Sequence, residues 1–301
     1  AGTSRLSRPK GTLMTYTELR CHSAFSFGDG ACTPEALVSR AAELGYAALG
    51  LTDGADLGGI IRFALEAERQ GIRPVIGAEL VVDGHPAAFL AMNEEGYRNL
   101  AGLVTRARVG APVAPGRALA RRRERGRPYH EVATRPRGRP WVSWEDVVER
   151  NAGLFALTGP ASGELAWLIR TGRRVEAAYR LGWWREVFGG RLAVEAQLHH
   201  VSGGEAELAA SLIELAERGR VPWVATNDPR YLDARSRLVH DLLTALRHGE
   251  DVSTAASRGH LLPNGEWRLK SPAEMTRLWR GREEGLEESR RIALSCDFDL
   301  R

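Results

Sequence analysis

The chain has 301 residues, of which 43% are hydrophobic and 27% are charged, and its formal net charge is +4. This length suffices for one large α/β domain or two smaller ones, and the composition is typical of a water-soluble globular protein rather than a disordered or fibrous one. No apolar run reaches the roughly 18 residues of a membrane span, so no membrane partner is expected, while the positive charge permits a polyanionic partner without establishing one.

The start of the chain has no features of a secretory signal. Residues 1–13 are polar and basic and lack an apolar stretch, and Met14 is a candidate native start, so we expect residues 1–14 to be a leader or an added remnant. Cys21, Cys32 and Cys296 are odd in number and form no Cys-x-x-Cys pair. This usage suits a reducing compartment and predicts a cytoplasmic protein.

The first candidate site follows a predicted strand at residues 16–21. Beyond it the chain turns polar and breaks at Gly28 and Gly30, a pattern typical of a strand whose C-terminal end delivers side chains into a site. His22 and Asp29 are both potential metal ligands, and a short loop can fold Asp29 back toward His22. The same pattern also fits an ordinary loop in which neither residue has a special role.

Strands and helices alternate over the next 80 residues. Thr33 is a plausible N-cap for a helix that begins at Pro34. The patterns predict strands at residues 47–51, 73–76 and 86–92, and helices at residues 60–70 and 97–108. Asp53 and Glu79 follow two of these strands. Repeated βα units with polar residues at the strand ends favour a β/α barrel or a doubly wound sheet, whose active site lies at the C-terminal ends of the strands.

An arginine-rich segment at residues 110–140 interrupts this alternation. Nine arginines fall between residues 117 and 139, against Glu124 and Glu131. Few residues there could join a core, which predicts an exposed loop. Two interpretations remain open: a solvated insertion, or an arm that binds the phosphates of DNA. Base stacking has little support, because Tyr129 is the only aromatic residue of the segment.

Regular patterns return at Trp144. They predict strands at residues 154–158, 192–198 and 221–226, and helices at residues 164–169, 175–188 and 205–218. The last strand runs into Asp228 and Arg230, so Asp228 is a further polar residue at a strand end. Residues 236–301 are predicted to be mainly helical, with Ser271 and Glu274 forming a capping box.

Several stretches, in this order and spacing, resemble the PHP (polymerase and histidinol phosphatase) domain. The pattern Leu-x-x-His-Ser-x-x-Ser-x-x-Asp-Gly ends at Gly30, and residues 35–51 read EALVSRAAELGYAALGL. The further matches are Thr-Asp at 52–53, GAE at 77–79, LAMNEEGYRNL at 90–100 and ATND at 225–228. The form most similar is that of bacterial C-family DNA polymerase III α subunits, in their error-prone branch. LKSPAEMTRL at 269–278 and IALSCDF at 292–298 resemble the helices that join this domain to the polymerase core.

The resemblance implies a fold and an activity. The fold is an α/β one: a distorted seven-stranded β/α barrel at residues 15–235, with a helical extension at residues 236–301 leading toward a polymerase core. In intact members a metal cluster at the barrel mouth is held by His, Asp, Glu and one Cys or His. It can hydrolyse phosphoesters, because the metals lower the pKa of a bound water. Polymerisation itself needs a palm domain with two Mg²⁺ sites, and the resemblance ends near Phe298, before the palm begins.

This sequence departs repeatedly from the family's metal-binding pattern. The ligand positions that survive are His22, Asp29, Glu79, His85 and Asp228. Arg20, Gly54, Pro160 and Arg230 stand where the resemblance implies further ligands. Arginine stays protonated and cannot coordinate a cation. We therefore expect Arg20 and Arg230 to replace the metals by pairing with the remaining acids, with no catalytic residue and no cofactor.

A single divalent ion is the alternative for this site. Zn²⁺, Mn²⁺ or Mg²⁺ would lie on His22, Asp29 and Glu79 at reduced occupancy. If several ions bind, the first replacement ligands to consider are Cys21 and His199 or His200.

Three functions therefore remain open. The first is a PHP domain of an error-prone polymerase, serving translesion or repair synthesis, whose degenerate metal site supports the polymerase core or other repair subunits. The second is a residual metal-dependent phosphoesterase or 3′–5′ exonuclease. The third is a stand-alone module that binds nucleic acid or a repair protein through the arginine-rich segment.

Overall fold

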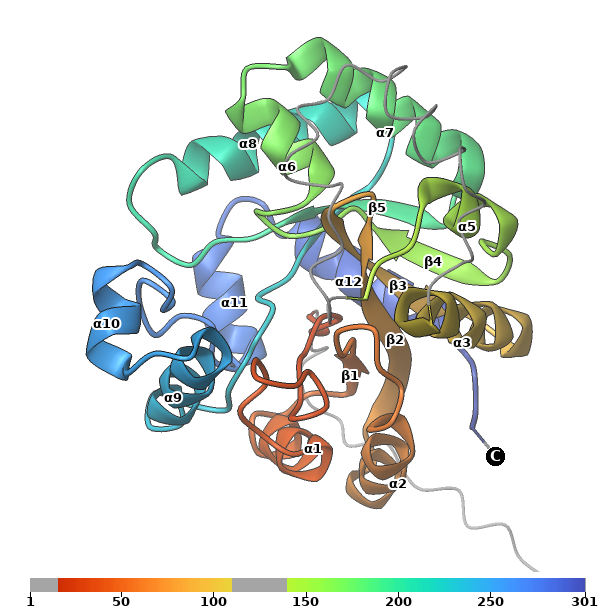
Figure 1. Cartoon of the computed structure of the whole chain (residues 1–301). Helices are drawn as coiled ribbons and strands as arrows, with labels where there is room; N and C mark the ends of the chain where they lie inside the picture. Colours follow the sequence, from red (N-terminus) through yellow and green to blue (C-terminus); the bar gives the residue numbers. More distant parts are fainter. Residues whose placement is uncertain (1–15, 110–139, 301) are drawn as a thin grey trace, which may run out of the picture.

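Six strands form one curled sheet in a mixed α/β fold (Figure 1). The structure is a computed structural model and describes residues 16–109 and 140–300. The predicted leader and nearly all of the arginine-rich segment therefore lie outside the described residues. The strands follow chain order across the sheet: β1 (Ala48–Leu51), β2 (Arg73–Val82), β3 (His85–Ala91), β4 (Leu154–Leu157), β5 (Leu192–Ala196) and β6 (Trp223–Ala225).

Helices surround this sheet. The two N-terminal helix caps that the sequence predicted, at Thr33 and Ser271, are both confirmed. Thr33 accepts a hydrogen bond from the Ala36 amide, and Ser271 forms the expected capping box with Glu274. The helices are α1 (Pro34–Glu43), α2 (Ile60–Gln70), α3 (Glu94–Val109), α5 (Trp144–Glu149), α6 (Glu164–Arg170), α7 (Arg174–Phe188), α8 (Glu205–Gly219), α9 (Arg237–His248), α10 (Val252–Ser257), α11 (Pro272–Leu278) and α12 (Glu284–Ser295).

The expected alternation of strand and helix is wrong between β2 and β3. These strands form an antiparallel hairpin, in which Val82 pairs with His85. The turn is Asp83-Gly84, with φ of 46° and 93°, the left-handed geometry that two-residue hairpin turns require. As a result β2 is longer than predicted, and Glu79 lies within the strand rather than after it.

The expected seventh strand at residues 16–21 is reduced to one isolated bridge, between Glu18 and Leu49. Two backbone bonds still tie this segment to β1 and the residue after it, from the amides of Gly50 and Thr52. The segment's own amides go elsewhere: Thr17 donates to Ser289, and Arg20 donates to the Glu18 carboxylate at 3.0 Å. These two amides therefore donate to side-chain oxygens and are not available for hydrogen bonds to a neighbouring strand.

Helix α12 is part of the core and packs against β1 and β6. Ile292 and Ala293 are buried among Leu19 and Val224, on the side of the sheet opposite to the larger core cluster. Figure 1 shows α12 passing behind the strands. No helix in the described part of the chain combines the length and apolar character needed to cross a membrane. Cys21, Cys32 and Cys296 are all free and buried.

Candidate functional site

A fully buried arginine lies at the centre of the candidate site. The Arg20 side chain has no exposed surface and contacts three carboxylates, which come from β2, β5 and the residues after β6. It donates to Glu79 and, at 3.0 Å, to Glu195, and its Nε lies 3.4 Å from Asp228 Oδ1. Arginine suits this place because its planar fork presents donors in several directions.

A second arginine closes the same cluster from the outside. Arg230 Nη2 donates to Asp228 Oδ2 at 2.6 Å, and Nη1 contacts both Asp29 and His22. Asp228 therefore lies between two guanidinium groups, with Oδ1 toward Arg20 and Oδ2 toward Arg230. Its backbone is left-handed, with φ of 50°, a conformation that aspartate tolerates better than most residues.

The loop folds Asp29 back toward His22, as the sequence allowed: His22 Nδ1 lies 2.9 Å from Asp29 Oδ2. The other ring nitrogen, Nε2, lies 3.6 Å from Glu79 and 3.7 Å from Asp228 Oδ1. His22 Nε2 and Asp228 Oδ1 are both buried and have no hydrogen-bond partner among the described residues. Within the same described ranges, no three His, Cys, Asp or Glu side chains are arranged to hold a metal ion.

The cluster shifts the pKa values of its members. Burial opposes ionisation of Arg20 and Arg230, but the surrounding carboxylates outweigh it and raise both pKa values. Burial likewise raises the pKa values of Glu79 and Asp29, yet the nearby arginines and His22 reverse this and lower both. For His22, burial and Arg230 lower the pKa, but the carboxylates prevail and raise it to about 9. Near neutral pH these five groups are therefore ionised.

Asp53, predicted at a strand end, holds the loop that carries Asp29. It accepts bonds from the Ser23 amide and hydroxyl, both at 2.7 Å, and from the Ser26 hydroxyl at 2.6 Å. Gly54 donates its amide to Ser26 and pairs with Glu79 in an isolated bridge. A Cβ atom added to Gly54 would meet nothing within 4 Å.

The other predicted ligands have different neighbours. The His85 ring lies 5.3 Å from Trp167 and its Nδ1 lies 3.5 Å from the Ser162 carbonyl. His199 stacks on Trp267 at 3.9 Å. Cys21 is fully buried among apolar residues, and burial raises the pKa of its thiol well above the usual range.

Sequence reasoning missed Glu195 and the contribution of α9. Glu195 is the one acid in the apolar strand Leu-Ala-Val-Glu-Ala, and a lone buried acid was the signal that it needed a partner. It accepts the Thr226 hydroxyl at 2.5 Å, and burial raises its pKa despite Arg20. From α9, His240 and Arg247 lie 3.9 and 3.7 Å from Asp29 Oδ1.

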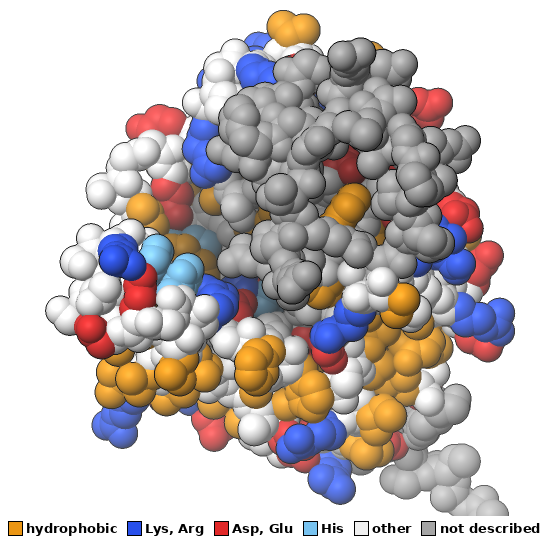
Figure 2. Space-filling model, viewed as in Figure 1, with side chains coloured by type: hydrophobic (Ala, Val, Ile, Leu, Met, Phe, Trp, Pro, Cys, Tyr) orange, Lys and Arg blue, Asp and Glu red, His pale blue; other side chains and the backbone are white. Residues whose placement is uncertain are grey.

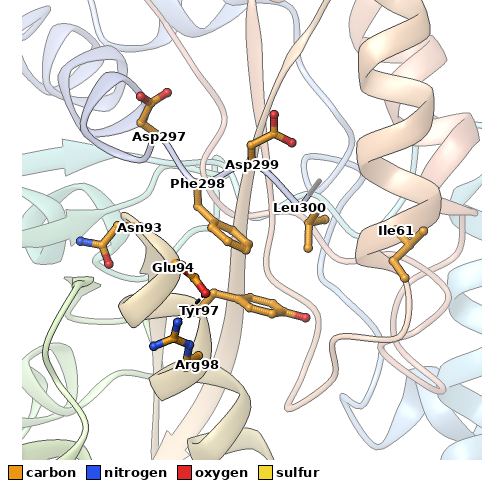
Figure 3. Close-up of a pocket in the computed structure, with 9 residues that line it drawn as sticks. All are labelled: Ile61, Asn93, Glu94, Tyr97, Arg98, Asp297, Phe298, Asp299 and Leu300. Carbon is orange, nitrogen blue, oxygen red and sulfur yellow. Dashed lines mark hydrogen bonds and ion pairs between the residues drawn. The ribbon is translucent and has the colours of Figure 1, made fainter.

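A cavity of about 680 Å³ lies elsewhere, between α3 and the end of the described chain. Figure 3 shows its lining, in which the rings of Tyr97 and Phe298 stack with centroids 4.7 Å apart. Arg98 pairs with Glu94 on the same wall. None of its lining residues belongs to the arginine–carboxylate cluster, so the cluster and this cavity are separate features.

Comparisons with known proteins identify the family of the chain. The family model of the PHP domain matches residues 18–199. An error-prone DNA polymerase of Anaeromyxobacter sp. (strain K) is 41% identical over 292 residues, which are 95% of this chain and 23% of that protein. An error-prone DNA polymerase of Dechloromonas aromatica is 34% identical over 291 residues, covering 96% of this chain and 25% of that protein. The chain thus spans about a quarter of the length of these relatives.

Two solved structures are similar at lower identity. One is a putative metal-dependent phosphoesterase from Bifidobacterium adolescentis, with 16% identity and a TM-score of 0.44. The other is an amidohydrolase from Chromobacterium violaceum, with 21% identity and a TM-score of 0.46. Each match covers 71% of this chain and 87% of the other.

Proposed function

Because the chain belongs to the PHP domain family, we propose that it is the PHP domain of an error-prone DNA polymerase with a degenerate metal site. In this proposal an arginine–carboxylate cluster replaces the metal ions, and the domain supports the polymerase core. One observation carries it: the guanidinium groups of Arg20 and Arg230 lie among the acids that the family pattern assigns to metal.

The residues present do not fit the family's metal cluster. Metal ligands must offer lone pairs to the ion, whereas Glu79, Asp29 and both oxygens of Asp228 already face a guanidinium. Arg20 is fully buried. If its side chain moved into solvent, three carboxylates would lose their positively charged partner. A divalent ion at the same place would also be repelled by two fixed positive charges. We therefore derive no hydrolytic step at this site.

A supporting role follows from what the cluster connects. Arg20 joins the segment at residues 16–22 to β2 and β5, and Arg230 joins the loop bearing Asp29 to the end of β6. We also infer that residues 16–22 act as the seventh strand of a closed barrel. Two backbone bonds reach this segment from the β1 side, and the His22 amide donates to Pro229 beyond β6 at 3.1 Å.

A single divalent ion remains the second candidate, with residual phosphoesterase or exonuclease activity. The observation in its favour is the group of buried atoms without hydrogen bonds, His22 Nε2 and Asp228 Oδ1, with Glu79 Oε2 beside them. A neutral imidazole and two carboxylates are a donor set that Zn²⁺ and Mn²⁺ accept, so ion binding would first have to displace the proton that His22 carries near neutral pH. A water molecule would satisfy the same atoms.

Elemental analysis separates these proposals. Protein purified without chelator, then equilibrated with Mn²⁺ or Zn²⁺ and desalted, should retain fewer than about 0.1 ions per chain. About one ion would favour the second candidate, and two or three would overturn the arginine replacement. As a matched gain-of-binding test, the triple variant Arg20→His, Gly54→His, Arg230→His should retain at least one ion. Adding Glu79→Gln to that variant should lower the retention.

The remaining assignments are proposals of the same kind. We propose that the partners are the polymerase core or other repair polymerase subunits in the cytoplasm, where the three free cysteines would stay reduced. Contact with DNA through residues 110–140 stays a prediction.

A further inference from the structure

Helix α9 is packed with its polar side inward. Its buried residues are small or polar: His240, Thr244 and Ala245. Most of its large apolar residues are exposed: Leu238 62%, Val239 47%, Leu242 46% and Leu246 73%, while Leu243 is half-buried. An ordinary surface helix has the opposite arrangement, with an apolar stripe toward the core. Leu238, Leu242 and Leu246 are spaced by four residues and form one ridge along the helix.

Other helices with exposed apolar residues do not share this inversion. On α7, Val175 is 88% and Tyr179 is 71% exposed, but the same helix buries Leu181, Trp184 and Phe188. For α9 the exposed ridge is the main apolar surface of the helix. Folded monomers rarely leave a continuous apolar patch in water, so such a patch marks an interaction surface.

A further exposed apolar residue lies in the loop beside the C-terminal end of α9. Phe27, in the loop that carries Asp29, is 96% exposed. The next residue, Gly28, lies against the C-terminal end of α9, where an added Cβ would come within 3.5 Å of Arg247 Cβ. In Figure 2 hydrophobic side chains gather at the lower left, over the position that α9 has in Figure 1.

The rim of this surface is positively charged. Arg235 precedes the helix and is exposed, and the Arg247 side chain is 38% exposed. Two nearby carboxylates are turned inward, whereas Asp251, which caps α10 by accepting from the Thr254 amide, is exposed. Asp241 is 13% exposed and lies 3.4 Å from Arg237. Glu250 is 10% exposed and pairs with Arg258 and His260, which follow α10.

We propose that α9 and Phe27 form a docking surface for an amphipathic α-helix of a partner protein, with Asp or Glu flanking its apolar face. A ridge with four-residue spacing packs into the groove between two such ridges of another helix. The carboxylates of the partner would meet Arg235 and Arg247. A second copy of this chain is a poor occupant, because two α9 ridges face to face would bring these arginines together.

Peptide binding tests this proposal. The probes are two fluorescein-labelled helical peptides of about 18 residues, or five turns, with Leu on one face and either Glu or Lys elsewhere. Fluorescence anisotropy at about 0.15 M salt should show the Glu peptide binding at least tenfold more tightly than the Lys peptide. Leu242→Asp should weaken the Glu peptide about tenfold. The matched control Val175→Asp, on the exposed face of α7, should leave its affinity unchanged.

A charge exchange sharpens the test. Arg235→Glu should weaken the Glu peptide and strengthen the Lys peptide, which a purely hydrophobic contact would not do. Equal binding of the Glu peptide to the wild type and to Leu242→Asp would overturn the proposal, since the net charge of the chain would then suffice. A dimer in sedimentation velocity that Leu242→Asp dissociates would also overturn it, in favour of a second copy as the occupant.

Discussion

At the scale of single residues, the cluster depends on charge balance in a buried place. Arg20 neutralises carboxylates from three parts of the chain, and its side chain has no contact with solvent. Removing one partner of a buried ion pair costs far more than the pair contributes, because the remaining charges stay desolvated. Surface pairs behave differently, since water solvates both partners.

The first prediction compares a buried with an exposed arginine. Arg20→Met should lower the free energy of unfolding by about 3–5 kcal/mol, because it removes the positive partner of three buried carboxylates. Arg40→Ala, which breaks an exposed pair with Glu43, should cost less than about 1 kcal/mol. Urea unfolding at neutral pH measures both. Similar costs for the two variants would mean that water reaches the carboxylates around Arg20.

The second prediction concerns Glu18. Burial raises the pKa of its carboxyl from 4.5 to about 8, although the Tyr16 hydroxyl and the amides of Arg20 and Asn227 lower it by donating to Glu18. The folded state therefore holds a proton that the unfolded chain has lost. Stability from this group is fully present below pH 4.5 and is lost as the pH rises toward 8, by at most about 1.4 kcal/mol per pH unit.

The measurement is urea unfolding of the wild type and of Glu18→Gln from pH 5 to pH 9. The amide cannot titrate, so the stability of the wild type relative to the variant should decline up to about pH 8 and then level off. Parallel profiles over this range would show that Glu18 is ionised throughout.

At the scale of elements, a glycine fixes how closely α12 approaches β6. A Cβ on Gly285 would lie 2.2 Å from the Trp223 ring, whereas a Cβ on Gly182, in α7, would meet nothing within 4 Å. Both positions are helical, so the intrinsic preference favours alanine over glycine at each of them.

The third prediction uses this pair. Gly285→Ala should lower stability by about 1–3 kcal/mol, because the overlap with Trp223 forces α12 away from the sheet. Gly182→Ala should raise it by about 0.5–1 kcal/mol, since only the helical preference changes. Thermal unfolding followed by circular dichroism distinguishes the two signs. A stabilised Gly285→Ala variant would mean that Trp223 moves aside at little cost.

Local signals predicted most elements, and the failures have physical causes. Caps at Thr33 and Ser271 were readable because they depend on residues three apart. The dipeptide Asp83-Gly84 is a typical sequence signal for a hairpin turn. The expectation of repeated βα units gave this signal too little weight. The reduction of residues 16–21 to one isolated bridge was not readable, since the Thr17 amide bonds to Ser289, far away in the sequence.

The candidate site was predictable in part. The contact between His22 and Asp29 is one that the sequence allowed, and the pairing of Arg230 with Asp29 and Asp228 follows the expectation. The role of Glu195 could not be read from the sequence, because the partner of a buried acid depends on which strands face each other across the sheet.

At the scale of the whole molecule, α12 packs against the sheet and shares an apolar core with it. Ile292 has no exposed surface, while Leu294, two residues further on, is 52% exposed. The buried side of α12 adds to the apolar core formed by β1 and β6.

The fourth prediction follows from this packing. Ile292→Ala should cost about 2–5 kcal/mol, and Leu294→Ala less than about 1 kcal/mol. Tryptophan fluorescence and circular dichroism should report the same urea transition for Ile292→Ala, because one cooperative unit unfolds. Two separate transitions would instead assign α12 to an independent unit.

The position of Asp228 between two arginines has a consequence for how this chain can evolve. Replacing either arginine alone leaves a buried carboxylate without its positive partner. Replacing Asp228 alone leaves two guanidinium groups without the carboxylate between them. Each single step toward a different site therefore passes through a less stable intermediate. We therefore expect the residues at positions 20, 228 and 230 to change together among related sequences: a relative that lacks one of Arg20, Asp228 and Arg230 should lack the other two.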